Sequence, residues 1–598
     1  MTLFLVRKFY LLAVVMVQVY GKDPNYRNIF YQTTKEVQNE ELSNIQGKIP
    51  AWIDGDFVRQ NCASYGDIDG SRNDWIPHMF DCISMVGRYE FKGGKIRYSN
   101  RLYDTKETRI WKHYNYSIAK SKVGWNTVFS TINASAYLKN MRMQYNETLH
   151  TTPNIVFWQS RPEDPVFAMT ESVYSAAELK VTPELDVLGS YLGKFHDKGF
   201  PNSSTHDFVI SPAHEQREKD GTIWHSTIDI ERASPKKFDD LEAAIIVYKM
   251  KGPNRTVTGR HVLGKYNLSK CRLGLGLDDI NIMPGYHHYM ETTSNYAIVP
   301  MSSYLFDYCQ HYMNINMRRI LGLFPRSFKF YPNFNSSLLL FDRSNMSNVH
   351  RVFLPFARFF THSVNAFEDL NYIYLDTIAY HNTDLYEKAF SLYEAMNGYT
   401  LNTYFIRIAI NKNTWSYDSS LSGSLTQTEP YGKAEFTQIN YDKFHNKDYT
   451  YTYFLSNPVN PEPRIAKLNV KTKNITYWVP PVGYYPQEPV FLQPDDAVGE
   501  DEGVILCSGP VSDTIPSSSF LAVLNATDMK LIAMVKNPNT GLISLHNRFY
   551  KSRVPATKAP ATTVKTKPKT TQSSPGVSLS IVQSIWIVAS YKLLRFLL

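Results

Sequence analysis

Short runs in which apolar and polar residues alternate recur along the chain. Residues 95–98, 222–224 and 465–470 show this alternation, and the first two runs directly follow Gly93-Gly94 and Asp220-Gly221. Alternation with a period of two after a glycine-containing turn is typical of β-hairpins. The pattern therefore predicts an all-β fold built from many short strands.

One stretch shows a helical period instead. In residues 383–396 the apolar residues Leu385, Ala389, Phe390 and Leu392 recur among charged positions. Spacings of three and four residues place apolar side chains on one face of a helix. We predict a helix over residues 383–396 and few others in the chain.

The composition describes a soluble globular body with a large core. Of the 598 residues, 43% are hydrophobic, and the mean hydropathy is −0.33. The 41 Tyr and 33 Phe are residue types that favour strands. Because large all-β bodies often exceed the usual domain size, we expect residues 22–552 to form one domain.

The net charge does not point to an acidic partner. It is +9, but residues 551–598 contain eight Lys and Arg and no acidic residue. The remaining body is nearly neutral and shows no cluster of basic residues, so we expect no nucleic-acid partner.

Both ends of the chain resemble targeting segments. Residues 1–21 form a secretory signal, in which Arg7-Lys8 precede an apolar core too short to span a bilayer. Residues 553–575 are rich in Thr, Lys and Pro, which predicts an extended stalk.

The hydrophobic tail at residues 576–598 has three interpretations. Small residues at Ser573, Ser574 and Gly576 fit a glycolipid anchor signal. A helix of about 22 residues would be about 33 Å long and could cross a membrane, although Lys592 and Arg595 shorten its apolar part. The third interpretation is an incidental tail. We favour the anchor, and expect a secretory-pathway protein held at the cell surface by its C-terminus.

Ten glycosylation sequons agree with this route, although chance alone supplies some of them. They begin at Asn115, Asn133, Asn146, Asn202, Asn254, Asn267, Asn335, Asn345, Asn474 and Asn525. The five cysteines allow at most two disulfides within the chain and leave one thiol. With no Cys-x-x-Cys pair, a zinc ribbon or thioredoxin-type site is not expected.

Four histidines, His214, His288, His362 and His546, are the candidate metal ligands. The first three are separated by 74 residues each, and the fourth follows after 184. A repeat of that length fits seven times into the body, as expected for a propeller of four-stranded blades. Two equal gaps among 16 histidines also arise by chance, and a lone His is often a hydrogen-bonded structural residue.

Several segments, in chain order, carry a resemblance to a known family. They are residues 46–59 (QGKIPAWIDGDFVR), 362–368 (HSVNAFE), 435–441 (EFTQINY), 485–491 (YPQEPVF) and 501–506 (DEGVIL). Together they resemble the carotenoid oxygenase family, which comprises the carotenoid cleavage dioxygenases and a retinoid isomerohydrolase.

The resemblance implies an all-β, seven-bladed propeller with a central metal site and a few helices capping one face. It implies that His214, His288, His362 and His546 bind Fe(II). Four neutral imidazoles suit Fe(II) and leave coordination positions free for O2, the co-substrate. By the same resemblance, Glu171, Glu435 and Glu488 orient the ligand rings, and the methyl group of Thr170 crowds one open position on the iron.

The implied activity is oxidative cleavage of a C=C bond in a carotenoid or apocarotenoid, giving carbonyl products. The alternatives are a retinyl-ester isomerohydrolase and a surface carotenoid or lipid carrier without turnover. The cysteine-bearing motif typical of the isomerohydrolase branch is not visible in residues 128–149.

The chain departs from the family pattern at three places. Cys62 ends a segment that is usually an Asn-Gly-Pro-Gly type turn, and Cys82 stands where a Phe-Asp-Gly step is usual. Gly87 stands where the family usually has His. These changes are expected to affect the blade-closing strands or the mouth of a substrate tunnel.

Overall fold

The computed structural model describes residues 23–552 except for 70–74, 106–107, 110–111, 113–154, 172–175, 181–184, 191–194, 202–204, 209, 235–236, 268, 273–279, 312–326, 427–432, 458–461 and 539–540. The predicted signal segment (1–21), the predicted stalk (553–575) and the apolar tail (576–598) lie outside the described residues. The same is true of Asn115, Asn133, Asn146, Asn202 and residues 128–149. One compact unit ends at Arg553. Within the part that is described, no helix has both the length and the apolar character to cross a membrane.

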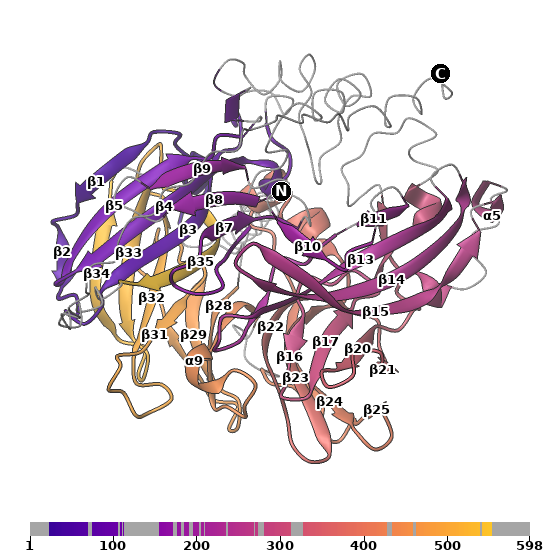
Figure 1. Cartoon of the computed structure of the whole chain (residues 1–598). Helices are drawn as coiled ribbons and strands as arrows, with labels where there is room; N and C mark the ends of the chain where they lie inside the picture. Colours follow the sequence, from indigo (N-terminus) through magenta and orange to yellow (C-terminus); the bar gives the residue numbers. More distant parts are fainter. Residues whose placement is uncertain are drawn as a thin grey trace, which may run out of the picture. The chain divides into compact units, whose positions relative to one another are not determined.

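Seven sheets of four or more strands make up the described body (Figure 1). With strands in spatial order, the first sheet consists of β1 (Val37–Glu41), β5 (Lys95–Leu102), β4 (Ile83–Lys92), β3 (Gly55–Ser64) and β35 (Ile543–Lys551). The second sheet consists of β6 (Val156–Trp158), β7 (Val166–Met169), β8 (Ala176–Lys180) and β9 (Asp186–Ser190). The third sheet consists of β10 (His196–Lys198), β15 (Asn254–Asn267), β14 (Lys237–Lys251), β13 (Ile223–Ser234) and β11 (His206–Phe208), and β12 (Gln216–Arg217) also pairs with β13.

The fourth sheet consists of β16 (Glu291–Thr292), β17 (Tyr296–Met301), β20 (Ser337–Asp342) and β21 (Val349–Phe353). The fifth sheet consists of β22 (Phe359–Glu368), β23 (Tyr372–Tyr380), β24 (Thr403–Asn411) and β25 (Ser416–Tyr417), and β26 (Gly423–Ser424) also pairs with β24. The sixth sheet consists of β27 (Ala434–Gln438), β28 (Tyr451–Ser456), β29 (Arg464–Asn469) and β30 (Ile475–Trp478). The last sheet consists of β2 (Ile45–Gly47), β34 (Leu531–Asn537), β33 (Ser518–Asn525), β32 (Val504–Val511) and β31 (Val490–Leu492). A small separate sheet pairs β18 (Tyr304–Phe306) with β19 (Phe328–Phe330).

Strands from the two ends of the chain close the arrangement. The C-terminal strand β35 pairs with β3, and the N-terminal strand β2 pairs with β34 of the last sheet. Strands at the ends of neighbouring sheets contact one another: β22 contacts β16 and β27, and β35 contacts β6 and β31. This is the arrangement of a propeller, in which radial repetition leaves only short sheet edges. The all-β prediction is confirmed.

The predicted hairpins form where the turn residues stand. Gly93 and Gly94 connect β4 to β5 with φ of +56° and +78°, a conformation that costs glycine little. The Asp220-Gly221 turn leads from β12 into β13. Residues 465–469 form most of β29, but Lys467 is buried as well as its apolar neighbours and pairs with Asp501 at 2.5 Å. Both faces of a blade pack against other blades, so alternation in sequence does not mark a solvent face here.

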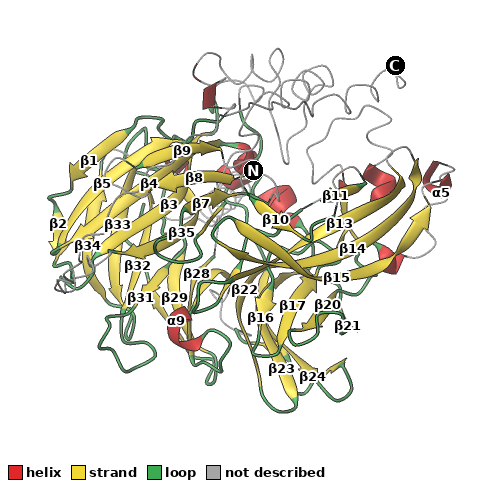
Figure 2. Cartoon of the chain, in the orientation of Figure 1, coloured by secondary structure: helices red, strands yellow, loops and turns green. Residues whose placement is uncertain are grey.

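Helices are few and short among the described residues (Figure 2). They are η1 (Tyr26–Phe30), η2 (Met79–Asp81), α5 (Ser269–Arg272), η4 (Ile280–Ile282), η5 (Leu385–Ala389), α8 (Leu392–Met396) and α9 (Tyr441–Phe444). The predicted helical stretch at residues 383–396 is helical but interrupted. It contains two pieces, η5 and α8, because Ser391 between them is extended (ψ 124°) and pairs with His78 as an isolated β-bridge. This tertiary contact has no signal in the local sequence.

The five cysteines behave as their number allows. Cys62 pairs with Cys82, and Cys271 pairs with Cys309, while Cys507 is a buried thiol. Two of the departures from the family pattern, Cys62 and Cys82, are thus bonded to each other.

Candidate metal centre

The four candidate histidines converge, with ligand nitrogens that all lie within 4.8 Å of one another. His214 stands just before β12, and His288 just before β16. His362 lies in β22, and His546 in β35. The three evenly spaced histidines therefore come from three successive sheets, which accounts for their 74-residue interval.

The ring geometry fits a bound metal ion. Ring centroids of His214 lie 5.0, 4.8 and 4.4 Å from those of His288, His362 and His546. The Nε2 atoms of His362 and His546 are 3.4 Å apart, and Nε2 of His214 is buried without a hydrogen-bond partner. Burial, with the neighbouring imidazoles, lowers the pKa of His214 and of His546 well below the usual value. Their rings are therefore neutral, the form that binds metal.

Each predicted carboxylate meets one ligand ring on its outer nitrogen. Nδ1 of His288 is 2.5 Å from Oε1 of Glu171, and Nδ1 of His546 is 3.0 Å from Oε1 of Glu488. Nδ1 of His362 bonds Oε2 of Glu435. A carboxylate at Nδ1 fixes the tautomer and turns Nε2 toward the metal position. The structure thus brings Glu171, Glu435 and Glu488 to the places that their predicted role requires.

The backbone is distorted where it aims these side chains. Strand β22 is bulged on both sides of Ser363, next to His362, and β27 is bulged between Glu435 and Gln438. Phe436, between them in sequence, has φ of +55°, a region that non-glycine residues rarely adopt. Bulges and strained residues of this kind re-aim side chains at functional sites.

The three carboxylates differ in their surroundings. Burial opposes ionisation of Glu435, but His362, Tyr380 and Thr361 bond it and hold its pKa below the usual value. Burial raises the pKa of Glu488 to about 8, against the stabilising hydrogen bond from the Asn547 N–H. A cation bound by the histidines would favour the ionised form of both.

Several tyrosines at the centre were missed from the sequence. The Tyr286 hydroxyl donates to Oε1 of Glu171 at 2.6 Å, and lies 2.7 Å from Nδ1 of His288. The Tyr386 hydroxyl is 2.6 Å from that of Tyr286. Only the position of Tyr286, two residues before His288, gave any hint in the sequence. Thr170 is half-buried between β7 and Glu171.

Aromatic rings pack near the ligand histidines in two groups. The ring of Phe359 lies 5.4 Å from that of Tyr286 and 5.0 Å from that of Tyr386. Phe436 lies 5.2 Å from His362 and 5.3 Å from His546. Aromatic side chains thus pack beside the ligand histidines at two places.

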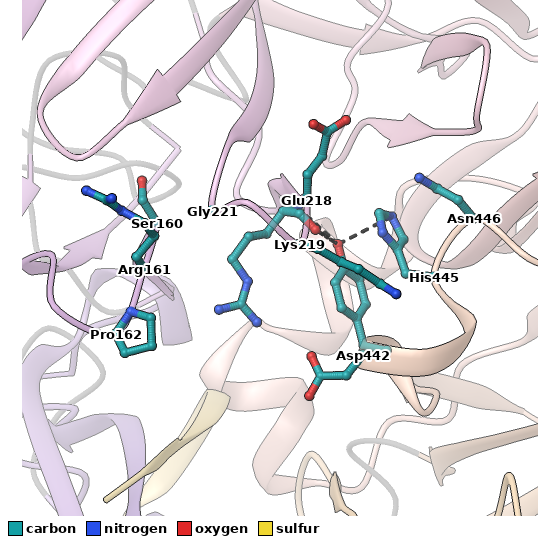
Figure 3. Close-up of a pocket in the computed structure, with 11 residues that line it drawn as sticks. Ser160, Arg161, Pro162, Glu218, Lys219, Gly221, Asp442, His445 and Asn446 are labelled. Atoms are coloured by element: carbon teal, nitrogen blue, oxygen red, sulfur yellow. Dashed lines mark hydrogen bonds between the residues drawn. The ribbon is translucent and has the colours of Figure 1, made fainter. Parts of the chain in front are cut away.

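A pocket of about 370 Å³ is lined by the turn between β12 and β13 and by residues of and just after α9 (Figure 3). Its lining is polar and charged and includes Arg217, Lys219, Asp442 and His445. The Tyr441 hydroxyl, which lines the pocket too, accepts a hydrogen bond from Arg217 N at 3.0 Å. Such a lining does not suit an apolar polyene.

Comparison with known proteins identifies the family. The family model described as retinal pigment epithelial membrane protein matches residues 30–551. The chain belongs to the carotenoid oxygenase family. Among curated relatives in this family, β,β-carotene 15,15′-dioxygenase of Gallus gallus is 23% identical over 567 residues, covering 87% of this chain and 97% of the relative. The human protein of the same name is 22% identical over 559 residues, covering 87% and 94%.

Solved structures of carotenoid oxygenases share the fold. A variant of the Synechocystis apocarotenoid oxygenase superposes with a TM-score of 0.65 at 17% identity, covering 88% of this chain and 98% of that one. A cobalt-substituted form of the Synechocystis enzyme also gives 0.65, at 18% identity and the same coverage.

The third departure from the family pattern lies next to the first. A Cβ atom at Gly87 would lie 2.8 Å from Nδ2 of Asn61, on the neighbouring strand, so a side chain there would require Asn61 to shift. Asn61 belongs to the same departure as Cys62.

Proposed function

We propose that this protein is an Fe(II)-dependent dioxygenase that cleaves a C=C bond of a carotenoid or apocarotenoid. The observation that carries the proposal is the convergence of four imidazoles, three of them held by carboxylates. Bound Fe(II) would supply the activation of O2. Both oxygen atoms enter the products, so one C=C bond becomes two C=O groups.

The residues around the centre have separable tasks. Glu171, Glu435 and Glu488 fix the ring orientation of His288, His362 and His546. Thr170 would narrow one approach to the metal, as the family resemblance implies. The rings of Phe359, Tyr286, Tyr386 and Phe436 offer aromatic faces that could stabilise positive charge developing on the polyene.

Two other functions compete with cleavage. A carrier needs an apolar cavity but no metal, and the paired His and Glu of this chain argue against it. An isomerohydrolase would use the same ligands, but the relatives matched over 87% of this chain are named as carotene dioxygenases.

Product analysis separates the three functions. Protein reconstituted anaerobically with Fe(II) would be incubated in air with β-carotene, with apocarotenals and with a retinyl ester. We expect aldehydes or ketones from a carotenoid or apocarotenal. Release of a retinol isomer from the ester, or recovery of every bound polyene intact, would support one of the competing functions.

We propose further that the body is exposed outside the cytosol and is tethered by its C-terminal tail through a glycolipid anchor. Of the sequon asparagines that the structure describes, Asn254, Asn267, Asn335, Asn345 and Asn474 are exposed and Asn525 is half-buried. Two disulfides within one chain favour an oxidising compartment. A membrane tether would hold the enzyme where apolar polyenes partition.

A further inference from the structure

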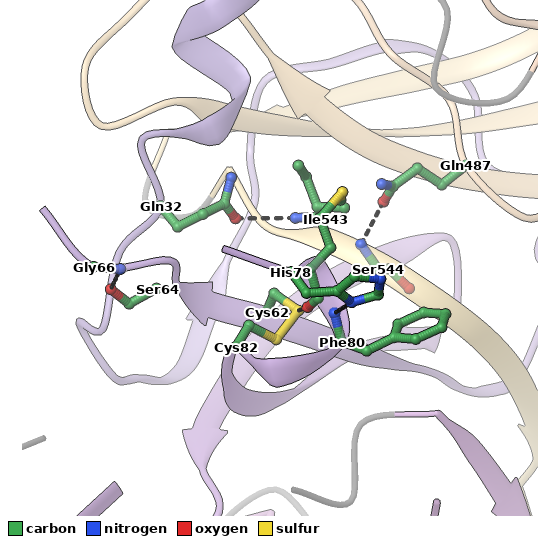
Figure 4. Close-up of a disulfide and its surroundings, with 11 residues drawn as sticks. Gln32, Cys62, Ser64, Gly66, His78, Phe80, Cys82, Gln487, Ile543 and Ser544 are labelled. Carbon is green, nitrogen blue, oxygen red and sulfur yellow. Dashed lines mark hydrogen bonds between the residues drawn. A yellow bond between two sulfur atoms is a disulfide. The ribbon is translucent and has the colours of Figure 1, made fainter. Parts of the chain in front are cut away.

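The Cys62–Cys82 disulfide lies next to a ligand-bearing strand. Cys62 is in β3 and pairs with Ile543 of β35, three residues before His546. Both cysteines are buried, at 3% and 0% exposure. Figure 4 shows the bridge close to His78 and Phe80. Residues 77–82, which include Cys82, are called the clamp segment. The disulfide therefore links β3, which pairs with the strand that carries His546, to the clamp segment.

The clamp segment holds the junction between η5 and α8. Met79 N donates to Phe390 O at 2.9 Å, and Leu392 N donates to Pro77 O at 2.9 Å. These two backbone bonds coincide with the break that divides the predicted helix into two. The position of η5 thus depends on the clamp segment.

His78 in the clamp segment grips η5 directly. Its Nε2–H donates to the carbonyl oxygen of Tyr386 at 2.8 Å. Its Nδ1 accepts from Phe80 N at 3.2 Å (Figure 4). Burial lowers the pKa of His78 to about 3, so the ring is neutral and these partners fix its tautomer. The ring of Phe80 also packs edge-on against that of Tyr386, at 5.6 Å.

Tyr386 carries this support to the metal centre. Its hydroxyl lies 2.6 Å from that of Tyr286 and 3.2 Å from Nδ1 of His288. Tyr286 in turn donates to Glu171, the carboxylate that orients His288. A continuous series of contacts therefore runs from the disulfide through His78 and Tyr386 to a ligand.

We propose that the clamp segment, fastened by the Cys62–Cys82 disulfide, positions the hydroxyl of Tyr386 against His288 and so sets the geometry of the metal centre. Tyr386 and His78 are positioning residues that act through His288. The disulfide is buried, so it acts as a permanent staple formed during folding, not as a reversible switch. The inference rests on the proposed metal site.

The second disulfide provides a matched control. In the chain-entropy model, loss of a crosslink costs more stability for a longer loop, and the loops span 20 residues for Cys62–Cys82 and 38 for Cys271–Cys309. Full-length Cys62→Ala/Cys82→Ala and Cys271→Ala/Cys309→Ala proteins would therefore be compared. A general loss of stability would affect the second variant at least as strongly.

Two readouts test the positioning role without relying on activity. One is the visible absorption spectrum of bound Co(II), which reports ligand geometry. The other is hydrogen–deuterium exchange of residues 383–396 in the metal-free protein. We expect the Cys62/Cys82 variant to shift the spectrum and speed this exchange, and the Cys271/Cys309 variant to match the wild type in both. Equal behaviour of the two variants would overturn the proposal.

Single substitutions keep the proposal testable if the cysteine variant does not fold. Tyr386→Phe removes only the hydroxyl, and we expect a shifted Co(II) spectrum and a roughly 10-fold loss of kcat, as for other partners of metal-bound His. His78→Phe removes the hydrogen bond to the Tyr386 carbonyl and should likewise shift the Co(II) spectrum and lower kcat. His78→Gln keeps a donor and should restore much of the lost kcat. Unchanged spectra in both Phe variants would refute the positioning role. Failure of the wild type to bind Co(II) or Fe(II) would instead refute the proposed function.

Discussion

Glu435 joins His362 to Tyr380: one carboxylate oxygen bonds Nδ1 of His362, and the other accepts the Tyr380 hydroxyl. Thr361 donates to that second oxygen as well, at 2.7 Å. Every described partner of this buried carboxylate is thus a donor, which favours the charged form. An ionised Glu435 in turn accepts from Nδ1 of His362, which turns Nε2 of that ring toward the metal position.

Glu435→Gln should therefore weaken the metal centre by removing the negative charge. The amide oxygen can still accept from the Nδ1–H of His362, and the NH2 can face the hydroxyls of Tyr380 and Thr361, so the variant tests the charge that supports the basicity of the ligand ring. We expect a loss of roughly 10 to 100-fold in iron affinity or activity. Competition with a chelator measures the affinity. The exposed Glu163→Gln is the control, and equal affinities in the two variants would contradict this role.

Replacing any one of His214, His288, His362 or His546 by Ala should abolish bound iron but leave the body folded. The propeller is closed by strand pairing between its ends and does not need the ion for its core. Iron content by elemental analysis, with circular dichroism as the check on folding, measures both. A full equivalent of iron in two of the variants would rule out this ligand set.

Glu291→Gln should stabilise the protein increasingly as the pH rises. Burial raises the pKa of Glu291 from 4.5 to about 8, against hydrogen bonds from Ser363 and Thr292. Above pH 4.5 the unfolded chain loses this proton, whereas the folded protein keeps it until about pH 8. The contribution of Glu291 to the free energy of unfolding therefore decreases as the pH rises from 4.5 to about 8.

An uncharged Gln lacks this pH dependence. The free energy of unfolding can be measured in urea at pH 5 and pH 8. Relative to the wild type, that of the variant should increase by more than about 1 kcal/mol between the two pH values. Glu163→Gln, at an exposed position, should show no such gain. A constant difference between wild type and Glu291→Gln at both pH values would disprove the assigned titration.

The ends of the chain predict glycosylation and release by a phospholipase. Expressed in animal cells, the protein should lose mass on treatment with an N-glycosidase, and Asn335→Gln should remove one glycan because Asn335 is exposed. A phosphatidylinositol-specific phospholipase should free it from intact cells. Glycosylation without release would favour a membrane span, and an unglycosylated cytosolic product would defeat the placement.

The sequence predicted the strands and the ligands because both follow short-range or periodic rules. Hairpins follow glycine turns such as Gly93-Gly94, and one His in each of three successive sheets reproduces the propeller's own period. His546 lies outside that period and was assigned through the family resemblance. The carboxylates Glu171, Glu435 and Glu488 have no such period, and were found only through resemblance to a family.

The contacts around Tyr386 were beyond prediction from this one sequence. His78 and Tyr386 are 308 residues apart, and the bridge from His78 to Ser391 divides a segment whose own pattern is helical. Five cysteines also allow many pairings, so the Cys62–Cys82 bond could not be assigned from their number. Non-local contacts of this kind depend on the closed fold.

The most direct test of the central claim is the stoichiometry of oxygen use by the iron-loaded protein acting on a carotenoid or apocarotenal that it binds. We predict that one O2 is consumed and two C=O groups appear for each C=C bond cleaved, with no cleavage under nitrogen or in His362→Ala. Intact substrate after prolonged incubation in air, with the wild-type protein fully loaded with Fe(II), would contradict the account.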